Sequence, residues 1–286
     1  MALKSFPAVF IISGLLFQGC LSARKMQGTD LYSGEGYHLV WADEFNTSDR
    51  PDSVTWNYEK GFVRNHEAQW YQRENTIVKD GNLIIEGRKE SRPNPLFEPG
   101  SNEWRKNRKD VEYTSSSINT RGKHEWQYGR FVMRGRIDIS DGLWPAWWTL
   151  GSKGNWPANG EIDIMEYYNK TLLANIACIG TDKKAEWFSN RFSIDSMGGK
   201  DWSSKFHTWR MDWDANSITL FCDDILLNKV ELNKLVNKDG SGKNPFMQPH
   251  YMLLNLAIGG DNGGDPSNTI FPNRFEIDYV RVYQKQ

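Results

Sequence analysis

The stretch FVMRGRIDI, residues 131–139, contains the pattern that decides the fold. Its odd-numbered positions are apolar or small, whereas residues 134, 136 and 138 between them are charged. Successive side chains of a β-strand point to opposite faces, so this alternation places one face in a core and the other in solvent. The stretch therefore predicts a half-buried β-strand.

Similar short runs follow one another along the chain. They cover residues 82–88, 113–120, 172–180, 207–213, 217–222, 251–258 and 275–283. Turn-forming residues separate them, among them Asp80-Gly81, Gly122, Asp141-Gly142 and the glycine-rich stretch from Gly259 to Gly264. Many strands with turns between them predict an all-β antiparallel sandwich or barrel. Only residues 230–236, VELNKLV, have a helical pattern, one or two turns long.

The composition limits the kinds of molecule that we expect the protein to bind. The chain has 286 residues, of which 38% are hydrophobic, and a net charge of −1 from 35 basic and 36 acidic residues. Such a chain is too apolar to be disordered, and its balanced charge argues against a nucleic acid or an anionic membrane surface as partner. Three Cys and five His show no metal-type spacing. The 13 Trp either stack on ligands or fill a core, and composition does not separate the two.

The N-terminal residues have the pattern of an export signal. Lys4 precedes an apolar run over residues 6–17, which is shorter than a membrane-spanning helix needs. Cys20, directly after Gly19, resembles the cleavage site of a bacterial lipoprotein, where the new N-terminal cysteine is lipidated. We therefore expect a signal peptide over residues 1–19, a tether over 20–36 and one domain over 37–286. The protein would be lipid-anchored in the cell envelope, whereas an ordinary signal peptide cut nearby would release it.

Cys178 and Cys222 are the remaining cysteines. They could pair in an oxidising compartment, but each lies within an apolar alternating run. This favours two small buried side chains over a disulfide.

The densest acidic cluster in an apolar run is GEIDIMEYY, residues 160–168. On a helix its three carboxylates would diverge. On a strand, Glu161 and Asp163 share a face, and a one-residue bulge before Glu166 brings the third acid to that face. Glu161 and Glu166 would then lie about 13 Å apart at the backbone. Their side chains could close this gap to the roughly 5 Å of a retaining glycosidase pair.

Three acids on one face suit the cleavage of a glycosidic bond. One carboxylate attacks the anomeric carbon and a protonated carboxyl group gives its proton to the leaving oxygen. Asp163 lies midway, where it would orient Glu161 and where its charge would help keep the proton on Glu166. The alternative is a solvated acidic strand face, on which three like charges would repel one another.

At this point the sequence resembles glycoside hydrolase family 16. GEIDIMEY fits the bulged form of the family's catalytic motif, and the segment from Ser115 to Gly151, WADEFN at Trp41 and FEIDYVRVYQ at Phe275 resemble its core, first and last strands. The resemblance implies a concanavalin-like β-jelly-roll sandwich of two antiparallel sheets with a concave substrate cleft. It also implies a retaining endo-β-glycanase with Glu161 as nucleophile, Asp163 as its helper and Glu166 as acid/base.

The resemblance also suggests the residues that bind sugar. We expect Trp144 and Trp148 to stack on sugar rings, with Trp147 in the core, because adjacent strand residues point to opposite faces. The other candidates are Trp156 in a loop, Asn65 and Glu67 on an alternating segment with Gln69, and His207 with Trp209. Core packing competes with cleft binding for His207 and Trp209, and a solvated edge strand competes for Asn65 and Glu67.

Members of the family often hold a structural calcium ion, and the matching residues here are Glu44, Gly81 and Asp278. Calcium accepts such mixed carbonyl and carboxylate ligands. The chemistry itself needs no cofactor. We expect a monomer whose partner is a polysaccharide or oligosaccharide, with no nucleic acid and with membrane contact only through the lipid anchor.

The substrate is where the chain departs from the family. β-1,3-Glucan-cleaving members usually carry a His in an HGT-like run, whereas Thr171 to Gly180 reads TLLANIACIG, with Asn175 as its only amide. The insertion Asn94 to Asp110, which contains Trp104, would add a loop beside the cleft. The sequence therefore leaves two classes of substrate open. One is β-1,3 or mixed-linkage glucan, and the other is β-galactoside chains, including mucin-type host glycans. A lectin-like binding module and a transglycosylase are the alternatives.

Overall fold

The computed structural model describes residues 30–285 of the chain. The predicted signal peptide, the lipidation site Cys20 and the tether up to residue 29 lie outside the described residues. Tyr32–Gln286 form one compact unit. In the part of the chain that the model describes, no helix has both the length and the apolar character to cross a bilayer.

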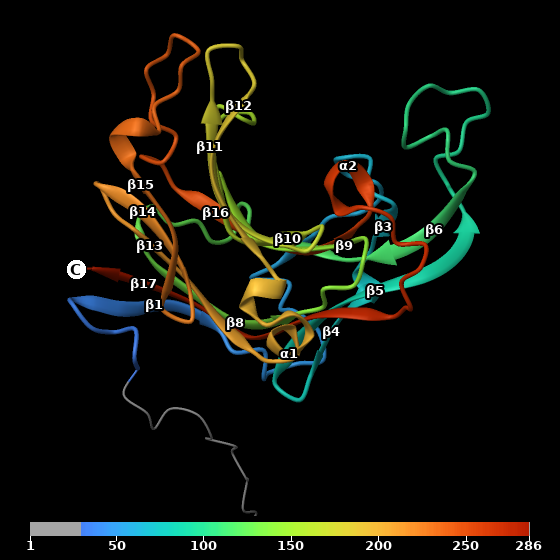
Figure 1. The fold of residues 1–286 in the computed structure, drawn as a ribbon, viewed down its shortest axis with the longest axis horizontal. Helices are drawn as coiled ribbons and strands as arrows, with labels where there is room; N and C mark the ends of the chain where they lie inside the picture. Colours follow the sequence, from blue (N-terminus) through green and yellow to red (C-terminus); the bar gives the residue numbers. More distant parts are fainter. Residues whose placement is uncertain (1–29, 286) are drawn as a thin grey trace, which may run out of the picture. The chain divides into compact units, whose positions relative to one another are not determined.

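Two β-sheets face each other in this unit, and we call them the front sheet and the back sheet (Figure 1). The front sheet is antiparallel throughout and has the strand order β12-β11-β10-β9-β16-β7-β2. Its strands are β12 (Ala185–Ser193), β11 (Thr171–Ile179), β10 (Glu161–Tyr168), β9 (Leu143–Gly151), β16 (His250–Ile258), β7 (Ser117–Asn119) and β2 (Asn57–Tyr58).

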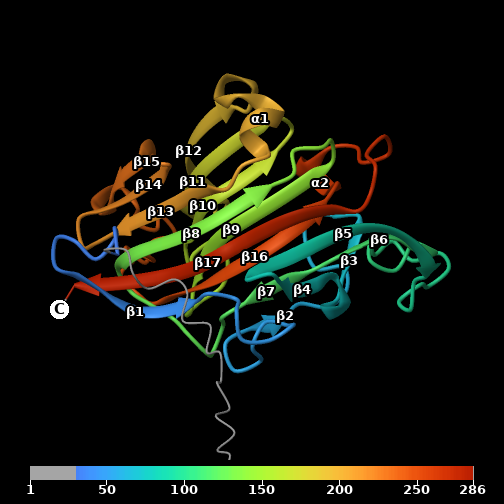
Figure 2. The ribbon, with the colours of Figure 1, turned by 90° about the horizontal axis from the view of Figure 1, so that it is seen from below.

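The back sheet has the order β15-β14-β13-β8-β17-β5-β6-β3, with β1 paired to β17 and β4 to β5 (Figure 2). Only the pairing of β3 with β6 is parallel among the described strands. Its strands are β15 (Ile225–Glu231), β14 (Ser217–Cys222), β13 (His207–Trp213), β8 (Gly129–Ile137), β17 (Asn273–Lys285), β5 (Asn82–Pro93), β6 (Asp110–Ser115), β3 (Gln69–Tyr71), β1 (Tyr37–Asp43) and β4 (Thr76–Lys79). The predicted all-β jelly-roll sandwich is confirmed.

The described helices are short. They are α1 (Gly199–Ser203), α2 (Gly260–Gly263) and the 3-10 turns η1 (Arg73–Asn75), η2 (Asp195–Met197) and η3 (Leu232–Lys234). Of the one or two helical turns predicted over residues 230–236, only a 3-10 turn at Leu232–Lys234 forms. Glu231 pairs with Ser217 and Val230 with Ile218, so the ladder between β14 and β15 continues into this segment and leaves only one 3-10 turn. Strand pairing here overrides the local helical pattern.

The core lies between the two sheets and follows the predicted alternation. Phe131 and Met133 of β8 are buried in it together with Trp209 and Trp213 of β13. The intervening charged residues of β8 are ion-paired instead: Arg134 and Arg136 each contact an acid of β17, at 2.7 Å, namely Asp278 and Glu276. One face of each back strand thus fills the core and the other carries paired charges.

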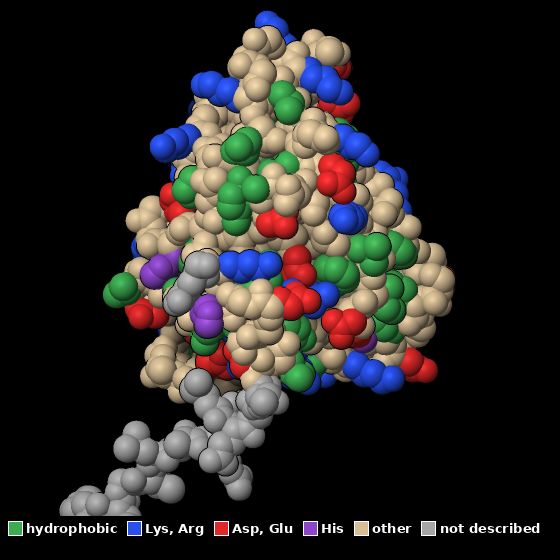
Figure 3. All heavy atoms as spheres, turned by 90° about the vertical axis from the view of Figure 1, so that its left-hand side faces the viewer, with side chains coloured by type: hydrophobic (Ala, Val, Ile, Leu, Met, Phe, Trp, Pro, Cys, Tyr) green, Lys and Arg blue, Asp and Glu red, His purple; other side chains and the backbone are tan. Residues whose placement is uncertain are grey.

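Cys178 and Cys222 are both buried and unpaired, which confirms the prediction. On the face of the molecule in Figure 3, acidic and basic side chains are interspersed, and the hydrophobic side chains form small separate groups. This mixed surface agrees with the balanced composition.

Candidate active site

The strand β10 carries the three acids, and its register contains the predicted bulge. Asp163 pairs with Asn175 of β11 and Glu166 with Leu173, and the register shifts between these pairs. The pairing with β9 shifts at the same place. Ile164 and Met165 are consecutive residues, yet both are buried in the core. Because the bulge places two consecutive side chains on the core side, Glu166 returns to the face of Glu161 and Asp163.

That face lines a cavity of about 610 Å³ on the side of the front sheet away from the core. Glu161, Glu166 and Asn175 contribute to its floor, and Trp144 and Trp148 of β9 line one part of it. Trp187 and Arg191 of β12 line another part. The cavity therefore joins carboxyl groups to aromatic side chains, as a sugar-binding cleft requires.

Glu166 is held by two neutral donors. The indole Nε1 of Trp144 donates to its Oε1 at 2.8 Å, and the Asn175 amide donates to its Oε2 at 2.8 Å. Burial raises the pKa of Glu166 from 4.5 to about 7, the charge of Glu161 adds to the increase, and the Trp144 and Asn175 hydrogen bonds oppose it. Glu166 is thus protonated at moderately acidic pH, the state that a general acid needs.

Glu161 has a different set of partners. Trp156 Nε1 donates to its Oε2 at 2.5 Å, and its side chain shares a further hydrogen bond with Asp163. Burial raises the pKa of Glu161, whereas these two bonds and the charge of Arg64 favour the ionised form. A carboxylate stabilised by two donors and a nearby cation is suited to act as a nucleophile.

Asp163 lies between the two glutamates and is 3% exposed. The Asn175 amide donates to its Oδ2 at 3.0 Å. Burial, and then the charges of Glu166 and Glu161, raise the pKa of Asp163 well above its ordinary value. This direction disfavours the predicted negative charge on Asp163, and its main cause is desolvation. Asp163 instead donates to Glu161, and Glu161 is the acid whose charge helps to hold the proton on Glu166.

The tryptophans lie as the alternation predicts. Trp144 and Trp148 line the cavity, and Trp147 is fully buried in the core. Trp156 lines the cavity from the loop before β10 and is 54% exposed. Trp148 donates from Nε1 to Asn255 at 2.7 Å, and the Arg64 guanidinium lies 5.2 Å from the centre of its ring. These contacts fix the orientation of the Trp148 ring.

Asn65 and Glu67 were predicted to share a face, but they lie in different surroundings in the structure. Asn65 lies in a loop with a left-handed backbone, at φ 53°, and lines the cavity. Glu67 is 2% exposed and is not among the residues lining the cavity, so its predicted role in binding sugar is wrong. It accepts from Gln69 at 2.6 Å and bonds Tyr71. The expected strand alternation fails because β3 begins only at Gln69.

Tyr71 connects Glu67 to the cavity. Asn255 donates to the Tyr71 hydroxyl at 3.2 Å and accepts from Trp148 on its other side. Glu67 is therefore the buried end of a hydrogen-bonded network that orients Trp148, and it acts on the cavity only through that network.

His207 and Trp209 lie in the back sheet, so their predicted place in the cleft is wrong. Trp209 is 1% exposed in the core. His207 contacts Asp223 at 2.5 Å and the Trp202 carbonyl at 2.8 Å, and the Trp202 ring stacks on its imidazole. Sequence alternation correctly gave the shared face but not the sheet to which that face belongs.

The calcium site predicted from the resemblance would use backbone carbonyls at Glu44 and Gly81 and the carboxylate of Asp278. Both carboxylate oxygens of Glu44 accept hydrogen bonds from Arg281, and Asp278 contacts Arg134 at 2.7 Å. Gly81 lies in the turn between β4 and β5. The one proposed carboxylate ligand, Asp278, is thus already paired with Arg134, and the calcium site stays a prediction.

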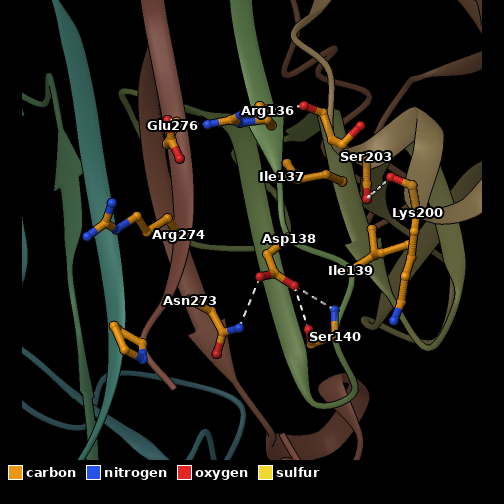
Figure 4. Close-up of a pocket in the computed structure, with 12 residues that line it drawn as sticks. Arg136, Ile137, Asp138, Ile139, Ser140, Lys200, Ser203, Asn273, Arg274 and Glu276 are labelled. Atoms are coloured by element: carbon orange, nitrogen blue, oxygen red, sulfur yellow. Dashed lines mark hydrogen bonds and ion pairs between the residues drawn. The ribbon is translucent and has the colours of Figure 1, made fainter. Parts of the chain in front are cut away.

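A second cavity, of about 590 Å³, lies by the back sheet beside α1 (Figure 4). Its charged groups are largely satisfied within the protein. Arg136 pairs with Glu276, and Asp138 accepts from Ser140 and Asn273, as Figure 4 shows. It holds no carboxyl groups arranged like those on β10, so the chemistry is assigned to the front sheet.

Several cavity residues escaped sequence reasoning: Arg64, Tyr168, Leu173, Trp187, Ser189, Arg191 and Asn262. The double contact of Asn175 with two acids was also missed, although its position as the only amide on the neighbouring strand was a signal. The insertion over residues 94–110 contributes none of the residues lining this cavity. Arg105 and Arg108 instead donate to the carbonyls of residues 62, 63, 66 and 67, so the insertion braces the segment that carries Arg64 and Asn65.

A jelly-roll sandwich with three acids on a bulged strand, in a cleft lined by tryptophan, defines a glycoside hydrolase of the endo-acting β-glycanase class. The chain belongs to the glycosyl hydrolases family 16, whose model matches residues 62–281.

Relatives and solved structures agree with this assignment. The chain is 35% identical to a beta-glucanase of Rhodothermus marinus over 96% of this chain and 93% of that protein. It is 26% identical to a keratan-sulfate endo-1,4-beta-galactosidase of Sphingobacterium multivorum, over 92% of this chain and 59% of that protein. A solved chain from work on endo-acting O-glycanases that human gut bacteria express to initiate mucin breakdown has a TM-score of 0.79 and 35% identity, covering 88% of this chain and 92% of that chain. The laminarinase catalytic domain of Thermotoga maritima has a TM-score of 0.73 and 30% identity, over 88% and 100%.

Proposed function

We propose that the protein hydrolyses internal β-glycosidic bonds with retention of configuration, by double displacement. The observation that carries this proposal is the contrast between two glutamates on one face of β10. Glu166 lies among neutral donors and its pKa is raised to about 7, whereas Glu161 has two hydrogen-bond donors and a nearby cation that favour its ionised form. Two carboxyl groups in such different surroundings take the roles of acid and nucleophile.

In the first step, a Glu161 oxygen forms a bond to the anomeric carbon while the bond from that carbon to the leaving oxygen breaks. Glu166 gives its proton to this oxygen. In the second step, water attacks the anomeric carbon, Glu166 takes a proton from the water, and the bond to Glu161 breaks. Asp163 donates a hydrogen bond to Glu161 when the ester is absent, and Asn175 holds Asp163 and Glu166 in place.

The stereochemistry of the first product tests this mechanism. Proton NMR during hydrolysis of a β-linked oligosaccharide should show the β-anomer first, followed by slow mutarotation. An initial α-anomer would show that water attacks directly and that Glu161 forms no ester. This result does not depend on which sugar is cleaved.

Two classes of substrate are proposed. The similarity to the beta-glucanase supports β-1,3 or mixed-linkage glucan, and the similarity to the keratan-sulfate galactosidase and the O-glycanase structure supports β-galactoside chains, including mucin-type glycans. Leu173 and Asn175 of β11 both line the cavity on a segment that has no imidazole. The Asn175 amide offers different hydrogen bonds to sugar hydroxyls than an imidazole would, and the Leu173 side chain offers none, which favours the second group.

Side-by-side digestion of laminarin, barley glucan, an agarose-type galactan and mucin glycans decides between them. Cleavage of the galactose-containing chains, with little release from laminarin, is the expected result. Rapid depolymerisation of laminarin alone would contradict this preference and leave the endo-glycanase class intact.

We also propose that the protein is an exported lipoprotein of a bacterial cell envelope, cleaved before Cys20. The support is the sequence pattern of residues 1–20. Expression in a bacterial host with radiolabelled palmitate, compared with a Cys20→Ala variant, tests the proposal. Loss of label and of membrane association in the variant is expected, and equal labelling of both would contradict lipidation at Cys20.

A further inference from the structure

The edge strand β12 presents three side chains to the cavity: Trp187, Ser189 and Arg191. The intervening residues of the strand point the other way. Asn190 donates to the Leu227 carbonyl of β15, and Phe188 and Phe192 pack against the core. The alternation of β12 therefore fixes Arg191 on the cleft side of the sheet.

Arg191 lies in line with the acid Glu166. Glu166 pairs with Leu173 across β10 and β11, and Leu173 pairs with Arg191 across β11 and β12. Two steps between neighbouring strands separate the two residues, about 10 Å at the backbone. Paired strand residues share a face, so an arginine side chain at this position reaches toward the sugars next to the scissile bond.

The charge of Arg191 acts on Glu166 and Tyr168 at longer range, but Arg191 has no direct partner among the described residues. Among residues 30–285, no hydrogen bond or ion pair joins its guanidinium to another side chain or to the backbone, and the side chain is exposed to the cavity. The other arginine of the cavity, Arg64, differs in this respect, because it is ion-paired with Glu59. The charge of Arg64 is thus compensated, whereas that of Arg191 is open to a ligand.

The neighbouring acid Glu166 interacts with the charge of Arg191 through space, without an ion pair. Burial raises the pKa of Asp163 and raises that of Glu166 to about 7, so the floor of the cavity next to Arg191 carries less negative charge than exposed carboxylates would. A planar guanidinium with parallel N–H groups matches the oxygens of a sulfate ester or a carboxylate. A neutral glucan offers only hydroxyl groups. Trp187, which is 45% exposed on the same strand, supplies an aromatic surface for the sugar ring that carries the anion.

We propose that Arg191 binds an anionic substituent, a sulfate ester or a carboxylate, on a sugar of the substrate next to the cleavage site. The protein would then prefer anionic β-galactoside glycans to neutral ones. This inference rests on the proposed function, since the ligand is the glycan that occupies the active-site cavity.

Binding to a Glu161→Gln variant tests the inference without turnover. The ligands are oligosaccharides of alternating galactose and N-acetylglucosamine in sulfated, sialylated and neutral forms, measured by calorimetry. We expect at least one anionic form to bind about tenfold more tightly than the neutral form, and the form that does so identifies the anion. Adding Arg191→Ala should remove this preference, and Arg191→Lys should keep part of it.

Lys184→Ala is the matched control, because it removes the same charge from the exposed turn before β12, outside the cavity. It should leave the preference unchanged. Equal binding of all three forms by the parent, or a preference that survives Arg191→Ala, would overturn the inference. If Arg191 served only to adjust Glu166, its loss would change the turnover of neutral and anionic substrates equally, which also contradicts it. If the wild type cleaved none of these forms, the proposed function would be contradicted. The binding measurements on the Glu161→Gln variant would still test the role of Arg191.

Discussion

Trp144 and Glu166 are joined by a direct hydrogen bond, in which the indole Nε1 donates to Oε1 at 2.8 Å. Trp144 is a candidate for stacking on sugar, and the structure gives it a second task next to the acid. A neutral donor to one carboxylate oxygen stabilises the ionised form of Glu166 and opposes the effect of burial on its pKa. Trp144 therefore helps to keep the acid near neutrality instead of letting its pKa rise further.

Replacing Trp144 by Phe keeps an aromatic ring and removes the N–H donor. Without this bond, the ionised form of Glu166 loses stabilisation, so its pKa rises above the present value of about 7. Glu166 acts as an acid, so kcat/KM falls as pH rises through its pKa, and this alkaline limb should move to higher pH in the variant. A pH profile of kcat/KM on a soluble oligosaccharide checks this. An unmoved alkaline limb would mean that Trp144 does not affect the acid.

Glu161→Gln should keep the fold and ligand binding and lose nearly all turnover, by at least about 10³-fold, because an amide does not form the covalent intermediate. Initial rates and a circular dichroism spectrum together measure this. Residual activity above about a tenth of the wild type would remove Glu161 from the role of nucleophile.

Glu166→Ala should impair natural glycans far more than aryl glycosides whose leaving groups depart without protonation. The comparison of kcat on a natural oligosaccharide and on a dinitrophenyl glycoside gives the ratio directly, and we expect it to change by about 10²-fold or more. A similar loss on both substrates would assign Glu166 a structural role only.

Burial raises the pKa of Asp163, which favours its protonated form as the donor to Glu161, while Asn175 donates to Asp163. Asp163→Asn preserves both a donor and an acceptor, so we expect a moderate loss of kcat, about tenfold. Asp163→Ala leaves Glu161 without this donor and Asn175 with Glu166 as its remaining acceptor, and should cost about tenfold more. Steady-state kinetics of the pair provide the comparison, and equal losses would show that the hydrogen bond to Glu161 does not matter.

Asn255 bonds both Trp148 and Tyr71, so it joins the buried Glu67 network to the cavity. Asn255→Leu should free the Trp148 indole and raise KM several-fold with a smaller change in kcat, since Trp148 lines the cavity as a proposed sugar-stacking residue and takes no part in the proposed proton transfer. Tryptophan fluorescence on titration with oligosaccharide gives a separate readout. A fall in kcat alone, with KM unchanged, would contradict a positioning role.

The alternation of residues along each strand was enough to predict most of the sandwich. It placed Trp147 and Trp148 on opposite faces of their strand, with the family resemblance assigning Trp147 to the core, and it required a bulge to bring Glu166 to the face of Asp163. These features depend on neighbours in the chain, because a strand has a fixed period of two and any extra residue on the core side must be absorbed locally. The catalytic acids were accessible from the sequence for this reason.

Only the tertiary structure decided whether a given strand face packs in the core or lines the cleft. His207 and Trp209 share a face as predicted, but that strand belongs to the back sheet and its face fills the core. Residues from distant segments, such as Trp144 and Glu166 or Asn255 and Tyr71, form contacts that no spacing in the chain reveals. The raised pKa values of Asp163 and Glu166 likewise follow from burial, which depends on all the strands packed around them and not on the motif itself.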